Sequence, residues 1–112
     1  MNKGNVKEWR EKQKLRLANI IASRLNLGLE DKKALNFMIK TINFKQLHRN
    51  GSNELIICAL SFYCLKTRKS NVQLEHYSIF KEYSLNYKTY STIITHLANY
   101  YQKKMLQRYV NI

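Results

Sequence analysis

Residues 55–65, with the sequence LIICALSFYCL, contain the longest apolar run of the chain. On a helix this segment would be apolar on every side rather than along one stripe, and such a helix has to be surrounded by others. The β-branched pair Ile56–Ile57 would also permit a buried strand, but twelve or more residues without glycine or proline favour a helix. We therefore predict a central helix over residues 53–66.

Amphipathic segments flank this helix on both sides, and they predict further helices over residues 6–25, 30–46, 73–83 and 87–109. Ser52 and Asn86 are placed to cap the third and fifth helices. The residues expected to face inward are Trp9, Leu17, Ile20, Ile21 and Leu25 in the first helix, Leu35, Met38, Ile39, Ile42 and Leu47 in the second, Leu74, Tyr77, Phe80 and Tyr83 in the fourth, and Tyr90, Ile94, Leu97, Tyr101 and Met105 in the fifth. The prediction is an all-α fold, a five-helix bundle around a buried third helix.

The composition is that of one small, strongly basic domain over residues 1–112. Twenty Lys and Arg residues against seven Asp and Glu residues give a formal net charge of +13. A hydrophobic fraction of 45% excludes a wholly disordered chain. The absence of proline and the three glycines argue against turn-rich all-β folds. The charge indicates a polyanionic partner.

Several classes of site find no support in the sequence. The apolar run is far shorter than the roughly 20 residues of a membrane-spanning helix, and no export signal precedes it. Cys58 and Cys64 would lie about 240° apart on a helix, which argues against a disulfide and suits a reducing compartment. The three histidines are isolated: His48, His76 and His96. We expect no metal, no cofactor, no enzymatic activity and a cytoplasmic location, or a nuclear one in a eukaryote.

Four segments together resemble one known family. Residues 17–27 (LANIIASRLNL) are similar to the "IA-x-x-L-x-L" helix that opens a cyclin-like repeat of the transcription initiation factor B family, archaeal TFB and eukaryotic TFIIB. Residues 49–52 (RNGS) resemble the family's "R-G-R-S" turn. Residues 57–65 stand where the family has "A-A-x-x-Y-x-A-C-R", and residues 74–78 (LEHYS) where it has "L-x-x-I-A".

This resemblance implies a cyclin-like fold whose last two helices form a helix-turn-helix-like pair. It covers one repeat and no zinc ribbon, so it implies a stand-alone TFIIB-like domain rather than a complete initiation factor. Residues 70–73 (SNVQ) replace the usual "V-P-R-T". The resemblance further implies double-stranded DNA, TATA-binding protein or RNA polymerase as partners. A viral or mobile-element source would suit a single copy of the repeat.

The start of the fifth helix is the main candidate for DNA contact. The second helix of a helix-turn-helix lies in the major groove, and its first residues meet base edges. From residue 83 to residue 112 the chain has no acidic side chain. The alternative is an ordinary polar face of an amphipathic helix. The candidate residues on this helix are Lys88, Thr89, Ser91, Thr92, Thr95, Lys103, Lys104 and Arg108.

Three further basic segments are weaker candidates. Arg49 lies in one loop, and Arg68 and Lys69 lie in another. Solvated loops at opposite ends of the third helix are the favoured explanation for them. Residues 1–8 begin a cationic segment that is either a flexible nucleic-acid arm or the solvated end of a helix. Of the eight tyrosines, those on the apolar stripes are assigned to packing rather than to base stacking.

Two functions from different classes remain open. The first is a DNA-binding, transcription factor-like protein that attracts phosphates with its basic surface and presents the fifth helix to the major groove. The second is a cyclin-like adaptor that binds host transcription or defence proteins without contacting DNA. A binder of RNA or single strands through exposed tyrosines is a third, weaker option.

Overall fold

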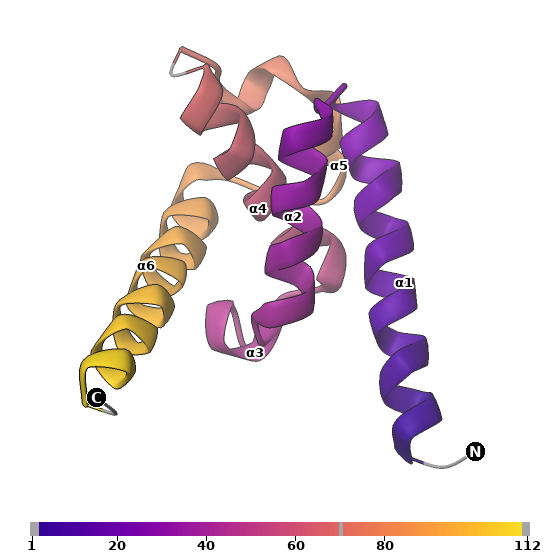
Figure 1. Cartoon of the computed structure of the whole chain (residues 1–112). Coiled ribbons are helices and arrows are strands. Elements are labelled where there is room, and N and C mark those ends of the chain that lie inside the picture. Colours follow the sequence, from indigo (N-terminus) through magenta and orange to yellow (C-terminus); the bar gives the residue numbers. More distant parts are fainter. Residues whose placement is uncertain (1–2, 70, 111–112) are drawn as a thin grey trace.

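The computed structural model describes the backbone of residues 3–69 and 71–110 and the side chains of residues 6–69 and 71–104. Within this part of the chain the fold is all-helical, without a strand. The elements are α1 (Lys3–Arg24), α2 (Leu29–Thr41), α3 (Phe44–Leu47), α4 (Asn53–Arg68), the 3₁₀ turn η1 (Leu74–His76), α5 (Ser78–Glu82) and α6 (Tyr87–Val110) (Figure 1).

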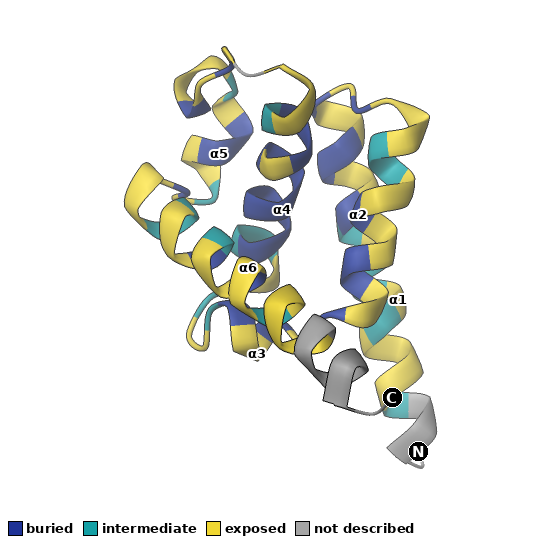
Figure 2. Cartoon of the chain, turned by 60° about the vertical axis from the view of Figure 1, so that its left-hand side comes forward, coloured by how far each residue is buried: buried dark blue, intermediate teal, exposed yellow. Residues whose placement is uncertain are grey.

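Helix α4 is the centre of the molecule, as the apolar segment predicts. Every residue from Ile56 to Phe62 is at most 1% exposed, and α1, α2, α3 and α6 pack around them (Figure 2). The Phe62 ring meets the rings of Phe80 and Tyr90 edge to face, with centroids 5.3 and 5.0 Å apart. Burial of this one helix therefore organises the whole bundle, and the predicted all-α fold around a buried central helix is confirmed.

The predicted helix caps are also confirmed. The Ser52 hydroxyl accepts a hydrogen bond from the Leu55 N–H at 3.1 Å, and the Asn86 side chain accepts one from the Thr89 N–H at 2.8 Å. Both satisfy backbone donors that a helix leaves unpaired in its first turn. Asn26 adopts a left-handed φ of 55° just after α1 and turns the chain toward α2.

The single second helix predicted over residues 30–46 is wrong, because α2 ends at Thr41 and a separate α3 follows. Side chains compete for the backbone at this point. The Thr41 hydroxyl donates to the Phe37 carbonyl at 2.8 Å, and the Asn43 side chain accepts from the Lys45 N–H at 3.0 Å. Asn43 thus caps a new helix, and the chain bends where the pattern predicted continuity.

The fourth helix predicted over residues 73–83 is likewise divided into η1 and α5. Tyr77 has extended dihedrals (φ −128°, ψ 115°) between the two elements. The Gln73 N–H donates to His76 Nδ1 at 3.2 Å, which closes a local turn in place of a longer helix. The structure therefore has six α-helices among the described residues rather than the five predicted.

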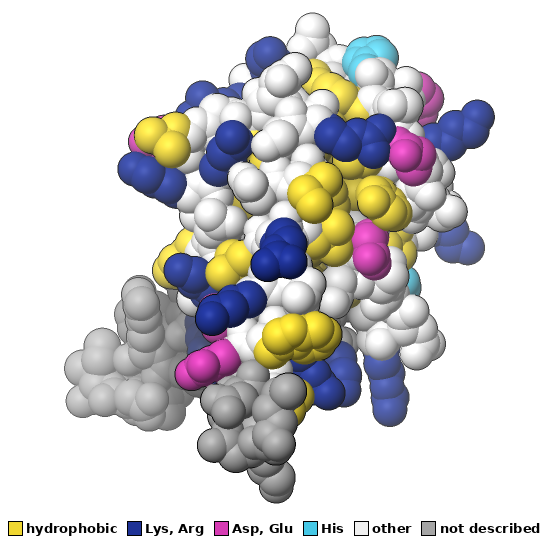
Figure 3. Space-filling view, turned by 90° about the vertical axis from the view of Figure 1, so that its right-hand side faces the viewer, with side chains coloured by type: hydrophobic (Ala, Val, Ile, Leu, Met, Phe, Trp, Pro, Cys, Tyr) yellow, Lys and Arg dark blue, Asp and Glu magenta, His cyan; other side chains and the backbone are white. Residues whose placement is uncertain are grey.

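Three residues predicted to face inward are exposed instead. Trp9 is 57% and Ile20 is 52% exposed. Figure 3, which views the molecule from the side of α1, shows hydrophobic side chains at the surface. On α6 the buried stripe passes through Ile93, which the prediction missed, whereas Tyr101 is 39% exposed. Met105, also predicted to face inward, lies outside the described side chains.

Helices α1 and α6 lie on opposite sides of the bundle and diverge toward the end where α3 lies (Figure 1). The radius of gyration of 14.7 Å exceeds the roughly 13 Å of a compact chain of this length. None of the described helices combines the length and the hydropathy required to cross a membrane.

Candidate nucleic-acid interface

The start of α6 lies on the outside of the bundle (Figure 2). Lys88, Ser91, Thr92 and Thr95 are exposed and, at about 100° per residue, lie on one face of the helix. The opposite face is buried against the core, whereas Thr89 is half-buried. Four of the five residues predicted at the helix start therefore form one polar surface with a single cation.

The threonine hydroxyls of this surface are oriented by their own helix. Thr92 Oγ1 donates to the Lys88 carbonyl at 3.1 Å, and Thr95 Oγ1 donates to the Ser91 carbonyl at 2.8 Å. Because the hydroxyl protons are used inside the helix, the oxygens present acceptor lone pairs outward. The surface can accept hydrogen bonds from base amino groups, and Lys88 can donate to a phosphate.

Tyr87 fixes the start of α6 to the segment that precedes α5. Its hydroxyl accepts a hydrogen bond from the Leu74 N–H at 3.0 Å and donates one to Gln73 Oε1. The turn between α5 and α6 spans residues 83–86 and includes Ser84 with a left-handed φ of 61°. A turn of this length is typical of helix-turn-helix pairs, although α5 is a helix of only five residues.

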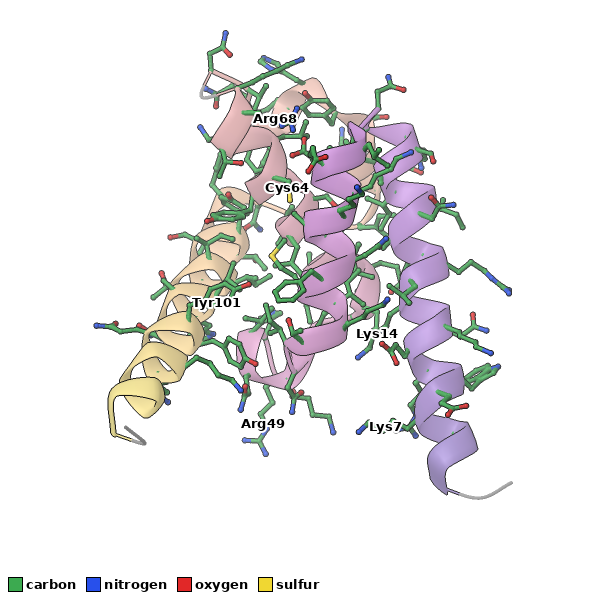
Figure 4. All side chains as sticks on the ribbon, in the orientation of Figure 1. Lys7, Lys14, Arg49, Cys64, Arg68 and Tyr101 are labelled. Atoms are coloured by element: carbon green, nitrogen blue, oxygen red, sulfur yellow. The ribbon has the colours of Figure 1, made fainter. Side chains whose placement is uncertain are left out.

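The predicted loop cations lie at opposite ends of α4. Figure 4 shows Arg49 at the lower end, beside α3, and Arg68 at the upper end. Arg68 Nε lies 3.1 Å from Asp31 Oδ1, so its charge is partly neutralised by α2. Lys69, the C-cap residue that follows α4, is exposed. These three cations do not form one patch.

Lys103 and Lys104 lie further along α6, away from its start. They line an open groove together with Thr41, Asn43 and Gln46, which belong to the end of α2 and to α3. The Lys104 ammonium lies 5.6 Å from the centroid of the Tyr100 ring. Arg108, the last predicted contact on this helix, lies outside the described side chains.

The two cysteine thiols are buried in the core, and one histidine is held by a backbone carbonyl. Burial raises the pKa of Cys58 to about 12 and that of Cys64 to about 11, so both thiols are protonated at neutral pH. His96 Nδ1–H donates to the Leu47 carbonyl at 2.7 Å and connects α6 to α3. Across the described residues no cluster of three or more His, Cys, Asp or Glu side chains is arranged for a metal ion.

Comparison with known proteins found no family model, no curated protein and no solved structure that matches the chain. Sequence reasoning missed the polar residues at the link between α2 and α3, because it placed that link inside a helix. Asn43 was the available signal, since asparagine is a preferred helix cap.

Proposed function

We propose that this protein binds double-stranded DNA and acts in transcription, with the start of α6 facing the major groove. The observation that supports the proposal is the exposed, acid-free face formed by Lys88, Ser91, Thr92 and Thr95 on a helix at the edge of the bundle. Short hydroxyl side chains at the start of such a helix can approach base edges closely, and the lysine can neutralise a phosphate.

The cyclin-like scaffold is part of this proposal. A buried central helix and a short turn before the last helix are compatible with the resemblance to a TFB or TFIIB repeat. On that resemblance, TATA-binding protein or RNA polymerase is the protein partner that we propose.

The test is a triple substitution of the α6 face: Lys88→Ala, Thr92→Ala and Thr95→Ala. We expect the affinity for a fluorescein-labelled duplex of about 20 base pairs, two helical turns, to fall at least about tenfold. The melting temperature should stay the same, because all three side chains are exposed. Fluorescence anisotropy measures the binding, and circular dichroism measures the melting.

The matched control removes one lysine and two small polar side chains from α1: Lys12→Ala, Asn19→Ala and Ser23→Ala. These residues are also exposed. The control variant should bind the duplex nearly as well as the wild type. Equal losses in the two variants would contradict a specific role for the start of α6.

A second function, a protein-binding adaptor, is favoured by one observation on α1. Trp9 and Ile20 are strongly exposed and lie eleven residues apart, which places them on the same side of the helix about three turns from each other. Exposed aromatic and aliphatic side chains are typical anchors of protein interfaces. If the α6 variant binds duplex as the wild type does, while Trp9→Ala weakens binding to TATA-binding protein, the adaptor is favoured over the DNA binder.

A further inference from the structure

Two open grooves meet at the link between α2 and α3. The first is the groove beside Lys103 and Lys104 on α6, and the second runs along the N-terminal half of α1. Thr41 and Asn43 line both, so the two grooves adjoin at this link and are described together as one surface. We name it the basic groove; its charged lining residues are Lys7, Arg10, Glu11, Lys14, Lys40, Lys103 and Lys104.

The charge of the basic groove comes from three helices that are distant in the sequence. The lining contains six cationic side chains and one carboxylate. The first and last of these cations, Lys7 and Lys104, are 97 positions apart in the sequence. Partial burial and the nearby Arg10 lower the pKa of Lys14 from its usual value, while Glu11 opposes this effect. Gathering cations in this way is electrostatically unfavourable, and a bound anion would relieve the repulsion.

Aromatic rings and hydrogen bonds hold the walls of the groove in place. The Lys14 ammonium lies 4.4 Å from the centroid of the Phe44 ring of α3, at the distance of a cation–π contact. The Tyr100 hydroxyl donates to the Thr41 carbonyl at 2.9 Å and so connects α6 to the groove floor. Figure 4 shows Lys7 and Lys14 on the side of α1 that faces the other helices. Lys14 is therefore positioned before any ligand binds.

We propose that the basic groove binds the phosphodiester backbone of the same duplex whose bases face the start of α6. This inference depends on the proposed function and assigns the phosphate contacts to a second surface. Three neutral residues of the lining carry amide groups, which contact phosphate oxygens in protein–DNA complexes: Asn43, Gln46 and Asn99.

The dimensions of the two surfaces fit one duplex. Lys88 and Lys103 lie about 22 Å apart along α6, which is less than the roughly 34 Å of one turn of B-DNA. Lys7, Arg10 and Lys14 follow each other on one face of α1 over about 10 Å. Phosphates of one strand advance about 3.4 Å each along the duplex axis, so this row can follow about three of them.

A phosphate chain fits the groove better than an acidic protein does. The anchors that a protein interface requires at its centre are large apolar side chains. On α1 the exposed residues of that kind, Trp9 and Ile20, lie on the face opposite Lys7 and Lys14. The groove instead combines cations with neutral hydrogen-bonding groups.

The experiment compares two double variants of α1 with equal loss of charge. The groove variant is Lys7→Gln with Arg10→Gln, and the control is Lys12→Gln with Arg16→Gln on the opposite face; all four side chains are exposed. A third variant, Lys103→Gln with Lys104→Gln, removes the other wall. Binding to the labelled duplex is measured by anisotropy between about 50 and 200 mM salt, and melting curves verify folding.

We expect both groove variants to bind at least about tenfold more weakly, with the slope of log K against log salt reduced by about 1.8. In the control variant the slope should decrease by less than half of that amount. Equal losses of affinity in the groove and control variants would overturn phosphate binding by the basic groove, although DNA binding itself would stand. A loss of affinity confined to one wall would have the same meaning. A stronger effect of the groove variants on binding of labelled polyglutamate than on duplex binding would also overturn it. Absence of duplex binding by the wild-type protein would overturn the proposed function itself.

Discussion

The Ser61 hydroxyl lies in the centre of the core, fully buried on α4, with no hydrogen-bond partner among the described protein atoms. A buried hydroxyl without a partner loses its hydrogen bonds to water on folding. Ile57, Cys58 and Leu65, three or four positions away on the same helix, are buried apolar side chains, so the surroundings are apolar. This single polar atom reduces the stability of the central helix.

We predict that Ser61→Ala stabilises the protein by about 1 kcal/mol, because it removes the unsatisfied group. Urea unfolding followed by circular dichroism measures the change. Ser91→Ala, at an exposed position of α6, controls for the higher helix propensity of alanine. A destabilisation of similar size would show that the hydroxyl has a partner in solution.

Arg24 and Glu82 connect the end of α1 to α5 through two hydrogen bonds between their side chains, one of them 3.2 Å long. Both side chains are largely exposed. The hydrogen bonds from Arg24 lower the pKa of Glu82 below its ordinary value of 4.5. Since the carboxylate is favoured in the folded state, its contribution is complete above pH 4.5 and is lost as the pH falls through the lowered value.

For Glu82→Gln we therefore predict a small decrease of the melting temperature at about pH 7 and a still smaller one at about pH 3. Thermal melts at the two pH values measure both quantities. A difference that grows as the pH falls would contradict the assigned sign.

At the scale of elements, we predict that the buried side chains of α4 contribute most to the free energy of unfolding. Phe62→Ala should destabilise the protein by about 3–5 kcal/mol, because a buried ring leaves a cavity between α4, α5 and α6. The neighbouring Tyr63 is 36% exposed, and Tyr63→Ala should cost about 1 kcal/mol or less. Urea unfolding compares the two.

If Phe62→Ala does not fold, Phe62→Leu keeps most of the volume and should cost about 1 kcal/mol. Similar costs for Phe62→Ala and Tyr63→Ala would contradict the burial of α4.

Tyr87 controls how α6 begins. Tyr87→Phe removes the hydrogen bonds to Leu74 and Gln73, and we expect a loss of about 1 kcal/mol in stability. If the position of the helix start matters for DNA contact, duplex affinity falls as well, although Tyr87 itself touches no proposed ligand group. Thr89→Val, on the same turn but half-buried, is the comparison. Unchanged stability of Tyr87→Phe would contradict the hydrogen bonds.

Elements marked by a continuous apolar segment or by a capping residue could be predicted from the sequence. The apolar segment 55–65 predicted the buried helix, and Ser52 and Asn86 predicted two helix starts. The bends near Asn43 and Tyr77 were missed because side chain–backbone hydrogen bonds there override an apolar pattern that continues through the bend. On α6 the adjacent Ile93 and Ile94 are both apolar, so periodicity alone does not decide which of them faces the core.

The candidate site, too, could be predicted from the sequence only in part. The polar face at the start of α6 follows from helical spacing and was predicted as such. The basic groove was not, because only the folded chain makes the groove that contains Lys7 and Arg10 adjoin the one that contains Lys103. The sequence alone suggested an arm or a solvated helix end.

At the scale of the whole molecule, the net charge of +13 is distributed unevenly. The acid-free length of α6 and the basic groove are both strongly cationic, whereas Arg68 and Arg24 are paired with carboxylates on other helices. We therefore expect a polyanion to approach the side of the protein that carries the basic groove. The number of phosphates neutralised on that side sets the salt dependence of binding.

The most direct test of the account is the affinity of the wild-type protein for the labelled duplex as a function of salt. If Lys88 and the six cations of the groove contact phosphates, the association constant should fall roughly 10³-fold or more between about 50 and 200 mM salt. A decrease of less than about tenfold over the same range would contradict phosphate neutralisation by these surfaces.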